Sequence, residues 1–229
     1  MVGKQRYMSH SVVIIDYGSG NLRSVAKAFE RIAMSGAVHG GVPAVITVSD
    51  DPAAIERADR IVLPGVGAFN ACLTGLRARP GVVEILETVV LKRAKPFLGI
   101  CVGMQLMAQS SAEFSTTDDP TLGLGWIDGT VVGLEPRQGN LCVPHMGWNA
   151  VEPVSAHPVM DGLHGQAFYF AHSYHFRCEN LAHQQAICAY GGDVTAVIGR
   201  DNLIGVQFHP EKSQGAGLRL IENFLRWKP

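Results

Sequence analysis

A cysteine near the middle of the chain lies at a junction that could make it a nucleophile. The motif is G-x-C-x-G, with Gly99 and Gly103 on either side of Cys101. It joins an apolar run that predicts a strand, residues 96–100, to a helical pattern at residues 102–109. Such a turn strains the backbone, and the dipole of the following helix favours the thiolate over the thiol. The motif therefore predicts a nucleophilic cysteine, and a structural cysteine in a tight turn is the alternative.

His209 and Glu211 follow another apolar run, residues 204–208, that predicts a strand. Side chains two apart on an extended segment point in the same direction, and Pro210 favours an extended backbone at the histidine. Glu211 can therefore orient the imidazole and stabilise its charged form, as the third member of a catalytic triad does. Amide cleavage by a thiolate requires a proton donor for the departing amine, and His209 could supply that proton. Together with Cys101, this pair predicts a cysteine-dependent amidase.

Two backbone segments could stabilise the oxyanion that forms when an amide is attacked. The N–H of Val102, directly after the cysteine, points to where this charge would develop. Residues 64–69 follow a strand predicted at 61–63 and open a helix, so their N–H groups are free to bind an anion. This loop lacks the G-K-[ST] ending of a nucleotide-binding P-loop. A glycine-rich connecting turn is the alternative for it.

The sequence offers little support for a cofactor or a metal ion. Residues 18–20, G-S-G, follow the first predicted strand as in dinucleotide-binding folds, but Arg23 occupies the third glycine position and would block close helix packing. His172 and His175 could form part of a metal site, but the sequence places no third ligand convincingly. The five cysteines show no C-x-x-C spacing, which argues against a zinc site or a disulfide framework. We therefore expect no cofactor and no metal.

The composition is that of a globular protein without a nucleic-acid or membrane role. Apolar residues make up 47% of the 229 positions and charged residues 17%, which is enough for a core and too little charge for disorder. The net charge of -1 gives no reason to expect nucleic acid or an anionic membrane as a partner. No apolar run approaches the roughly 20 residues that span a bilayer, and residues 1–10 contain no apolar signal core. A cytoplasmic location is expected.

The first half of the chain alternates predicted strands and helices. Short apolar runs, of the kind that strands covered on both faces show, predict strands at 12–15, 44–48, 61–63 and 96–100. Apolar residues at helical spacing predict helices at 22–33, 68–78 and 82–93. This order predicts a parallel sheet with helices on both faces.

After residue 121 the pattern changes to Gly, Pro and short β-rich runs. These runs predict mixed or antiparallel strands added to the same sheet, at 129–134, 167–172, 186–190, 194–198 and 203–208. An amphipathic pattern at 218–227 predicts a closing helix. We expect one three-layer α/β domain over residues 11–229, preceded by an N-terminal extension at 1–10.

These motifs together resemble those of the class I glutamine amidotransferases, and within that class the glutaminase subunits of imidazole glycerol phosphate synthases from histidine biosynthesis. The resemblance covers nearly the whole chain. Its most specific pieces are residues 15–21 (IDYGSGN), 64–69 (PGVGAF), 99–105 (GICVGMQ), 144–149 (PHMGWN) and 205–213 (GVQFHPEKS). The PHMGWN and PGVG pieces distinguish it from the anthranilate-type and pyridoxal-type amidotransferases. The resemblance implies the three-layer fold of that class, with a mostly parallel central sheet and added antiparallel strands.

By this resemblance, the chain would hydrolyse glutamine to glutamate and ammonia. Cys101 would attack the side-chain amide, His209 would protonate the departing ammonia and then activate water, and Glu211 would orient the imidazole. The remaining matched positions are the oxyanion donors Val66, Gly67 and Val102, and the glutamine-binding residues Gln105, Glu113 and Ser173.

An ammonia-producing site without a second catalytic domain implies a partner. The resemblance identifies it as a (β/α)8-barrel cyclase, which would form a heterodimer with this chain and use the ammonia to make imidazole glycerol phosphate and AICAR. Positions that match the docking face are Asn21, Trp148, Tyr169 and Lys212. The alternatives are a glutaminase subunit of another synthase, a cysteine peptidase on the same scaffold, and a non-catalytic docking module.

Overall fold

The computed structural model describes residues 10–18, 20–35, 44–116, 119–136 and 141–229. Apart from His10, the N-terminal extension expected at 1–10 lies outside the described residues, so its boundary with the domain stays a prediction. Within the described ranges, no helix combines the length and the apolar character needed to cross a membrane.

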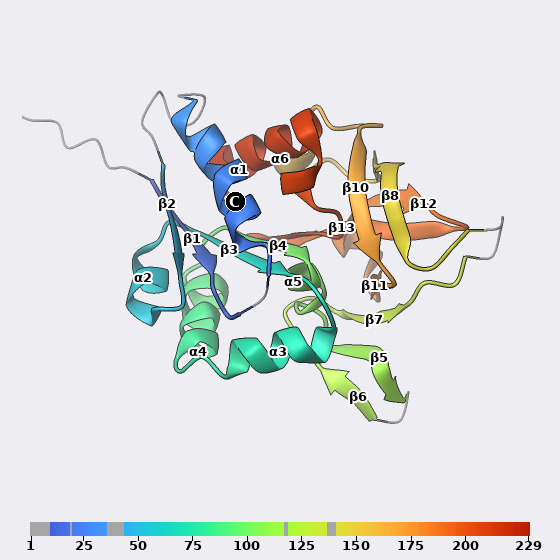
Figure 1. Ribbon diagram of the computed structural model, residues 1–229, viewed down its shortest axis with the longest axis horizontal. Coiled ribbons are helices and arrows are strands. Elements are labelled where there is room, and N and C mark those ends of the chain that lie inside the picture. Colours follow the sequence, from blue (N-terminus) through green and yellow to red (C-terminus); the bar gives the residue numbers. More distant parts are fainter. Residues whose placement is uncertain (1–9, 19, 36–43, 117–118, 137–140) are drawn as a thin grey trace, which may run out of the picture.

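A sheet of eight strands forms the centre of the fold (Figure 1). Its spatial order is β2-β1-β3-β4-β14-β13-β12-β9. The first five strands in this order pair in parallel, and the last three add antiparallel pairs. The strands are β1 (Ser11–Ile15), β2 (Val45–Ser49), β3 (Arg60–Gly65), β4 (Phe97–Cys101), β9 (Glu152–Pro153), β12 (Gln184–Ala189), β13 (Asp193–Arg200) and β14 (Leu203–Val206). The predicted mostly parallel sheet with added antiparallel strands is confirmed.

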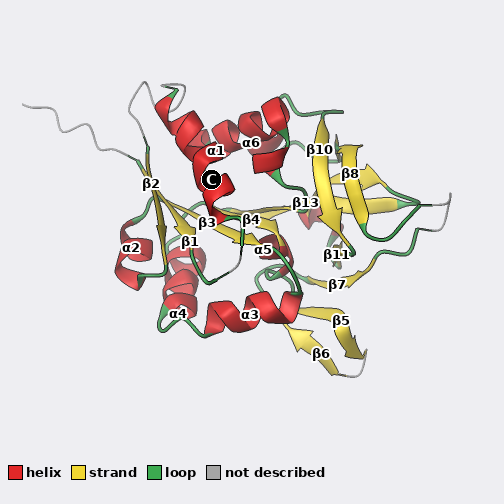
Figure 2. Ribbon diagram, viewed as in Figure 1, coloured by secondary structure: helices red, strands yellow, loops and turns green. Residues whose placement is uncertain are grey.

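Helices cover both faces of this sheet (Figure 2). On one face, α1 (Leu22–Met34) and α6 (Gln214–Arg226) lie side by side, and Phe29 meets Phe224 edge to face with ring centroids 6.3 Å apart. The opposite face carries α2 (Pro52–Arg57), α3 (Phe69–Arg77) and α4 (Val82–Leu86). This arrangement gives the predicted three layers, because each helix has one apolar stripe and buries it against the sheet.

Two smaller sheets lie beside the antiparallel part of the main sheet (Figure 1). One pairs β10 (Ala167–His172) with β8 (His145–Ala150), and the other has the order β11-β7-β5-β6. Strands β5 (Ser110–Thr116), β6 (Asp119–Leu122), β7 (Gly129–Gly133) and β11 (Tyr174–Cys178) form the second. The expectation that the runs at 129–134 and 167–172 join the main sheet was therefore wrong. A local apolar pattern predicts a strand, but the choice of neighbour depends on long-range packing.

Helix boundaries also differ from those predicted. The helix after the cysteine, α5 (Val102–Gln105), ends at residue 105 rather than 109, because the N–H groups of Met107 and Ala108 bond back three residues instead of four. The pattern at 82–93 divides into α4 and a π-helix at Glu87–Lys92. Helix α6 begins at residue 214 rather than 218. Apolar spacing shows which face is buried, and it does not distinguish these hydrogen-bond patterns.

Candidate active site

Cys101 lies at the sharp turn between β4 and α5, as the elbow motif predicts. Its backbone has φ 54° and ψ -112°, a conformation that residues with a side chain rarely adopt. The turn needs glycine at 103, because a Cβ there would lie 1.8 Å from the carbonyl oxygen of Leu63 on the neighbouring strand. A Cβ at Gly99 would lie 2.7 Å from the carbonyl oxygen of residue 103. The glycines therefore let the strand and helix approach closely, and they hold the thiol at the helix N-terminus.

The imidazole of His209 lies between Cys101 and Glu211. Its Nδ1 lies 2.9 Å from Glu211 Oε1, and both side chains are almost fully buried. Burial lowers the pKa of His209, but hydrogen bonds to Cys101 and Glu211 and the charges of these two groups raise it more, to about 9. The backbone helps to place the ring, because the N–H of His209 donates to the carbonyl of Tyr169 at 2.9 Å. The three predicted residues thus meet at one point, where a charged imidazolium is favoured at neutral pH.

Asn21 makes a contact that the sequence did not reveal. Its Nδ2 donates to Glu211 Oε1 at 2.6 Å, across 190 positions of the chain. Asn21 precedes α1 with a positive φ of 73°, a conformation that asparagine tolerates better than most residues. We predicted Asn21 as a docking residue, and that role stays a prediction. Its side chain also holds the carboxylate that orients His209.

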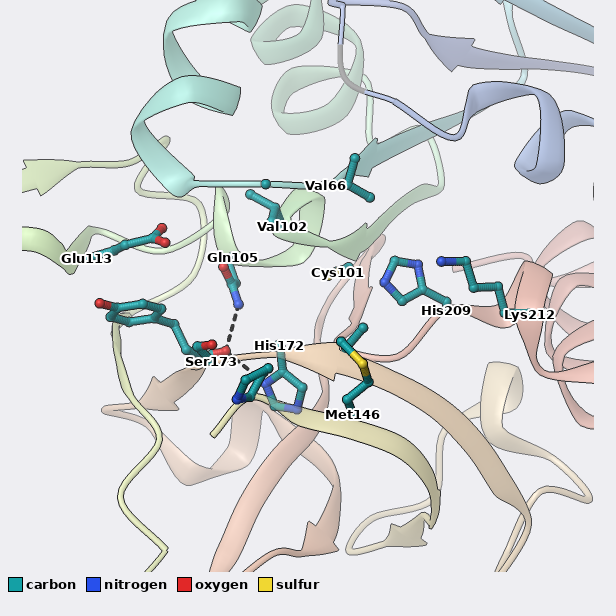
Figure 3. A pocket seen from close by; sticks show the side chains of 14 residues that line it. Val66, Cys101, Val102, Gln105, Glu113, Met146, His172, Ser173, His209 and Lys212 are labelled. Atoms are coloured by element: carbon teal, nitrogen blue, oxygen red, sulfur yellow. Dashed lines mark hydrogen bonds between the residues drawn. The ribbon is translucent and has the colours of Figure 1, made fainter. Parts of the chain in front are cut away.

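A cavity of about 370 Å³ opens beside these residues (Figure 3). Its size is in the range of pockets that bind small molecules. The predicted oxyanion and glutamine-binding residues all lie in its wall, together with two of the predicted catalytic residues and one predicted docking residue: Val66, Gly67, Cys101, Val102, Gln105, Glu113, Ser173, His209 and Lys212. The structure therefore brings together residues that the sequence places on five separate segments.

Two buried glutamines connect the wall of the cavity to the thiol. Gln105 Nε2 donates to the carbonyl of Tyr174 at 2.9 Å and to Gln207 Oε1 at 3.0 Å. Gln207 Nε2 in turn lies 3.8 Å from Cys101 Sγ. Since both amide hydrogens of Gln105 have partners, the side chain is fixed before any substrate enters. Sequence reasoning missed Gln207, although it lies inside the GVQFHPEKS piece.

The loop at 64–69 is held from two sides. Cys72 Sγ donates to the carbonyl of Val66 at 3.3 Å. Glu113 Oε2 accepts the N–H of Phe69 at 2.5 Å, at the N-terminus of α3. Gly67 has φ +98°, which a residue with a side chain would adopt only with strain. The loop thus has a defined conformation next to the thiol.

Three of the predicted docking residues form one cluster, and one of them, Lys212, also lines the cavity. Trp148 on β8 and Tyr169 on β10 are direct cross-strand neighbours, with ring centroids 6.2 Å apart in an edge-to-face arrangement. Lys212 Nζ lies 5.7 Å from the centre of the Tyr169 ring, within reach of a cation–π interaction. Trp148 is 49% exposed and Met146, on the same strand, 66%. Large exposed apolar side chains of this kind are typical of an interaction surface.

The fold and the site together define a class of protein. A cysteine at an elbow after a parallel strand, facing a histidine–carboxylate pair at the end of the adjacent strand, is typical of α/β enzymes that cleave amides through a thiolate.

The chain belongs to the family described as glutamine amidotransferase class-I, whose profile matches residues 13–227. The predicted family and fold class are thereby confirmed.

Curated relatives align over almost their whole length. A protein from Rhodospirillum rubrum, named imidazole glycerol phosphate synthase subunit HisH, is 54% identical over 95% of this chain and 99% of its own. Proteins with the same name from Rhodopseudomonas palustris and Brucella abortus are 53% and 52% identical, over 96% and 95% of this chain and 100% and 99% of their own.

Solved structures share the fold at low sequence identity. A glutamine amidotransferase matches with a TM-score of 0.65 at 19% identity, covering 93% of this chain and 96% of its own. Another, from Thermotoga maritima, matches with a TM-score of 0.56 at 18% identity, over 88% and 76%.

Proposed function

We propose that this chain is the glutaminase subunit of an imidazole glycerol phosphate synthase in histidine biosynthesis. It hydrolyses glutamine to glutamate and ammonia and delivers the ammonia to a cyclase partner. The observation that carries the proposal is the buried His209 held between Cys101 and Glu211 beside a cavity of small-molecule size. The names of relatives more than 50% identical support the choice of synthase.

The reaction proceeds through a thioester. The thiolate of Cys101 attacks the side-chain carbonyl carbon of glutamine, and His209, protonated at neutral pH because its pKa is raised to about 9, gives a proton to the departing ammonia. The neutral imidazole then removes a proton from water, which attacks the thioester and releases glutamate and the thiolate. Glu211 holds the ring in place and stabilises its charged form.

The developing oxyanion is bound by backbone N–H groups. Val102 offers one at the N-terminus of α5, and the Val66–Gly67 segment of the facing loop offers the others. One donor of this kind contributes about 3 kcal/mol to stabilising a transition state.

Glutamine is recognised by groups from three elements of the cavity wall. Glu113 supplies a carboxylate for the substrate ammonium group, and its own position is secured by the N–H of Phe69. Ser173, in the same cavity wall, supplies further polar atoms. Gln105 uses its amide hydrogens within the protein, so its side-chain oxygen is the atom left to meet the substrate.

The partner is a (β/α)8-barrel cyclase that forms a cytoplasmic heterodimer with this chain. It docks on the exposed side chains of Met146 and Trp148, with Tyr169 and Lys212 beside them and Asn21 near the triad carboxylate. This surface adjoins the cavity, because Met146 and Lys212 contribute to both. Ammonia therefore leaves the site directly into the partner, which makes imidazole glycerol phosphate and AICAR.

The test is glutamine hydrolysis by wild type, Cys101→Ala and Cys142→Ala, measured as glutamate and ammonia, with and without the cyclase and its nucleotide ligand. Cys142 is exposed and lies outside the cavity, so it is the matched control. We expect Cys101→Ala to stay folded and lose all turnover, and Cys142→Ala to behave as wild type. A glutamine-analogue electrophile should label only proteins that retain Cys101.

The outcomes separate the alternatives. Turnover that persists in Cys101→Ala contradicts the mechanism. A wild type that neither hydrolyses glutamine nor reacts with the electrophile, with the cyclase present, indicates a non-catalytic docking module. Peptide cleavage without glutamine cleavage indicates a cysteine peptidase, and activity stimulated only by a different synthase changes the partner.

A further inference from the structure

Two buried histidines next to the triad form a hydrogen-bonded pair that the mechanism does not use. His145 on β8 and His172 on β10 are direct cross-strand neighbours, and His145 Nδ1 lies 3.0 Å from His172 Nε2. The outer nitrogens also have partners. His172 Nδ1 lies 2.9 Å from the carbonyl oxygen of Tyr174, and His145 Nε2 lies 3.4 Å from Asn149 Nδ2. His172 lines the cavity (Figure 3), whereas His145 is not part of the cavity wall.

The partners determine where each proton resides. The Tyr174 carbonyl can only accept, so His172 Nδ1 carries a hydrogen. Burial lowers the pKa of His145 to about 4 and that of His172 to about 3, so both rings are neutral at pH 7. His172 Nε2 is then an acceptor, which requires a hydrogen on His145 Nδ1 and leaves His145 Nε2 to accept from Asn149. The orientation of the Asn149 amide agrees, because its Nδ2 also donates to the carbonyl of Ala189 at 2.9 Å.

The chain of donors ends at a carbonyl that the substrate pocket depends on. Tyr174 O accepts from His172 and also from Gln105 Nε2 at 2.9 Å. Gln105 continues through Gln207 to the thiol of Cys101. Two donors thus fix this carbonyl, and with it Tyr174, which itself lines the cavity.

The other end of this series of hydrogen bonds lies under the docking surface. The ring of His145 is stacked between Phe170 and Tyr190, with centroids 4.6 Å and 3.9 Å apart and interplanar angles of 18° and 23°. The next residues on its strand include the exposed Met146 and Trp148. A displacement of β8 would therefore move the imidazole and its hydrogen bond to His172.

We propose that His145 and His172 are positioning residues: a neutral pair that ties the docking strand β8 to the wall of the glutamine pocket through the Tyr174 carbonyl. The proposal rests on the proposed function and specifies how the position of the glutamine pocket is coupled to that of the docking surface. His172 is not a second general base, since both its nitrogens are occupied. Its neutrality leaves His209 as the single cationic imidazole in the cavity wall that the structure describes.

The first test compares two substitutions of His145. Asn can place an amide N–H where Nδ1 of His145 donates to His172. Leu has a volume similar to that of histidine and can pack between the rings of Phe170 and Tyr190, but it cannot donate a hydrogen bond. With the cyclase and its ligand present, His145→Leu should lose about tenfold in kcat/KM for glutamine, the equivalent of one hydrogen bond, and His145→Asn should stay within about threefold of wild type. A packing role predicts the reverse order, with Leu better than Asn, and that order would overturn the proposal.

The second test uses Asn149→Asp to reverse the donor–acceptor direction of the hydrogen bonds through His145. A carboxylate accepts from His145 Nε2–H and so removes the hydrogen from Nδ1, and the pair is broken until His145 becomes charged and donates from both nitrogens. An opposite charge raises a pKa by about 1–3 units, which would bring His145 from about 4 to roughly 5–7. The titratable groups that face the pair are His175 and His209 around His172, and the Tyr190 phenol, whose hydroxyl donates to the carbonyl of Cys142.

The expected readout is a ratio that depends on pH. The kcat/KM of Asn149→Asp relative to wild type should rise as the pH falls from about 8.5 to about 5.5, because the charged His145 restores the pair. Asn149→Ala, which only removes a donor, should give a ratio that does not change with pH. Equal ratios at every pH for both variants would contradict the proposal.

A measurement without turnover separates this proposal from the function itself. Nitrogen-15 NMR of histidine-labelled full chain should show the hydrogen on Nδ1 of both His145 and His172 at pH 7. A hydrogen on Nε2, or a charged ring, would overturn the tautomer assignment and the proposal with it. If wild type fails to hydrolyse glutamine while the NMR result holds, the proposed function fails and the histidine pair remains.

Discussion

The charge of Glu211 should make the stability of this protein depend on pH through His209. Replacing Glu211 by Gln removes the charge but keeps an oxygen that can accept from His209 and from Asn21. Against the effect of burial, Cys101 and Glu211 raise the pKa of His209 from 6.5 to about 9 in the folded chain. A raised pKa in the folded state stabilises the fold fully below pH 6.5, and this stabilisation is lost as the pH rises through about 9.

The magnitude follows from the same values. The difference between 6.5 and about 9 corresponds to about 3 kcal/mol, shared between Cys101 and Glu211. We expect the advantage of wild type over Glu211→Gln in free energy of unfolding to be about 1–3 kcal/mol larger at pH 6 than at pH 9.5. The Gln side chain also buries an amide group where Glu211 Oε2 has no hydrogen-bond partner among the described residues. That cost does not depend on pH, so it cancels when the two pH values are compared.

The assay is urea unfolding of both proteins at several pH values between 6 and 9.5, with an NMR titration of His209 in each. Cys101→Ala serves as a second variant, because loss of the other partner should also lower the pKa of the imidazole. A difference in unfolding free energy that is the same at every pH would refute the reasoning. So would an unchanged pKa of His209 in both variants.

Three further predictions address the scaffold and the triad. Gly103→Ala should lower the free energy of unfolding by more than about 3 kcal/mol or prevent folding, because its Cβ would meet a backbone carbonyl of β3. The control is Gly215→Ala, where a Cβ meets no atom within 4 Å, and this variant should be neutral or slightly stabilising. Equal effects of the two substitutions would contradict the steric argument. Arg60→Met should lower the free energy of unfolding by about 2–3 kcal/mol in chemical denaturation, since the guanidinium of Arg60 donates to two carbonyls at the end of α6. An unchanged denaturation midpoint would show that these hydrogen bonds contribute nothing to stability. Asn21→Gly keeps the positive φ but loses the hydrogen bond to Glu211, so the glutaminase kcat of this chain without its partner should fall about tenfold. A kcat equal to that of wild type would restrict the role of Asn21 to docking.

The chemistry of the site was predictable from the sequence where it depends on neighbours in the chain. The elbow around Cys101 follows from two glycines within two positions. The contact between Glu211 and His209 was predicted for a wrong reason, because residues Pro210–Lys212 form a 3-10 helix and not the extended segment that the spacing argument assumed. The parallel half of the sheet was equally predictable, because buried strands and amphipathic helices alternate along it. In the elbow and in the alternating strands and helices, the local backbone determines which side chains point the same way.

The tertiary structure decided the contacts that join distant segments. The bond from Asn21 to Glu211 spans 190 positions, and the link from Gln105 to Gln207 spans 102. The same holds for the pairing of β8 with β10, which brings His145 to His172 and Trp148 to Tyr169. A strand pattern shows which face is apolar but not which strand lies beside it, because that choice depends on how the layers pack. The sequence by itself therefore predicted a nucleophile, its base and a class of reaction, whereas only the packing of the layers determined what holds these groups in place.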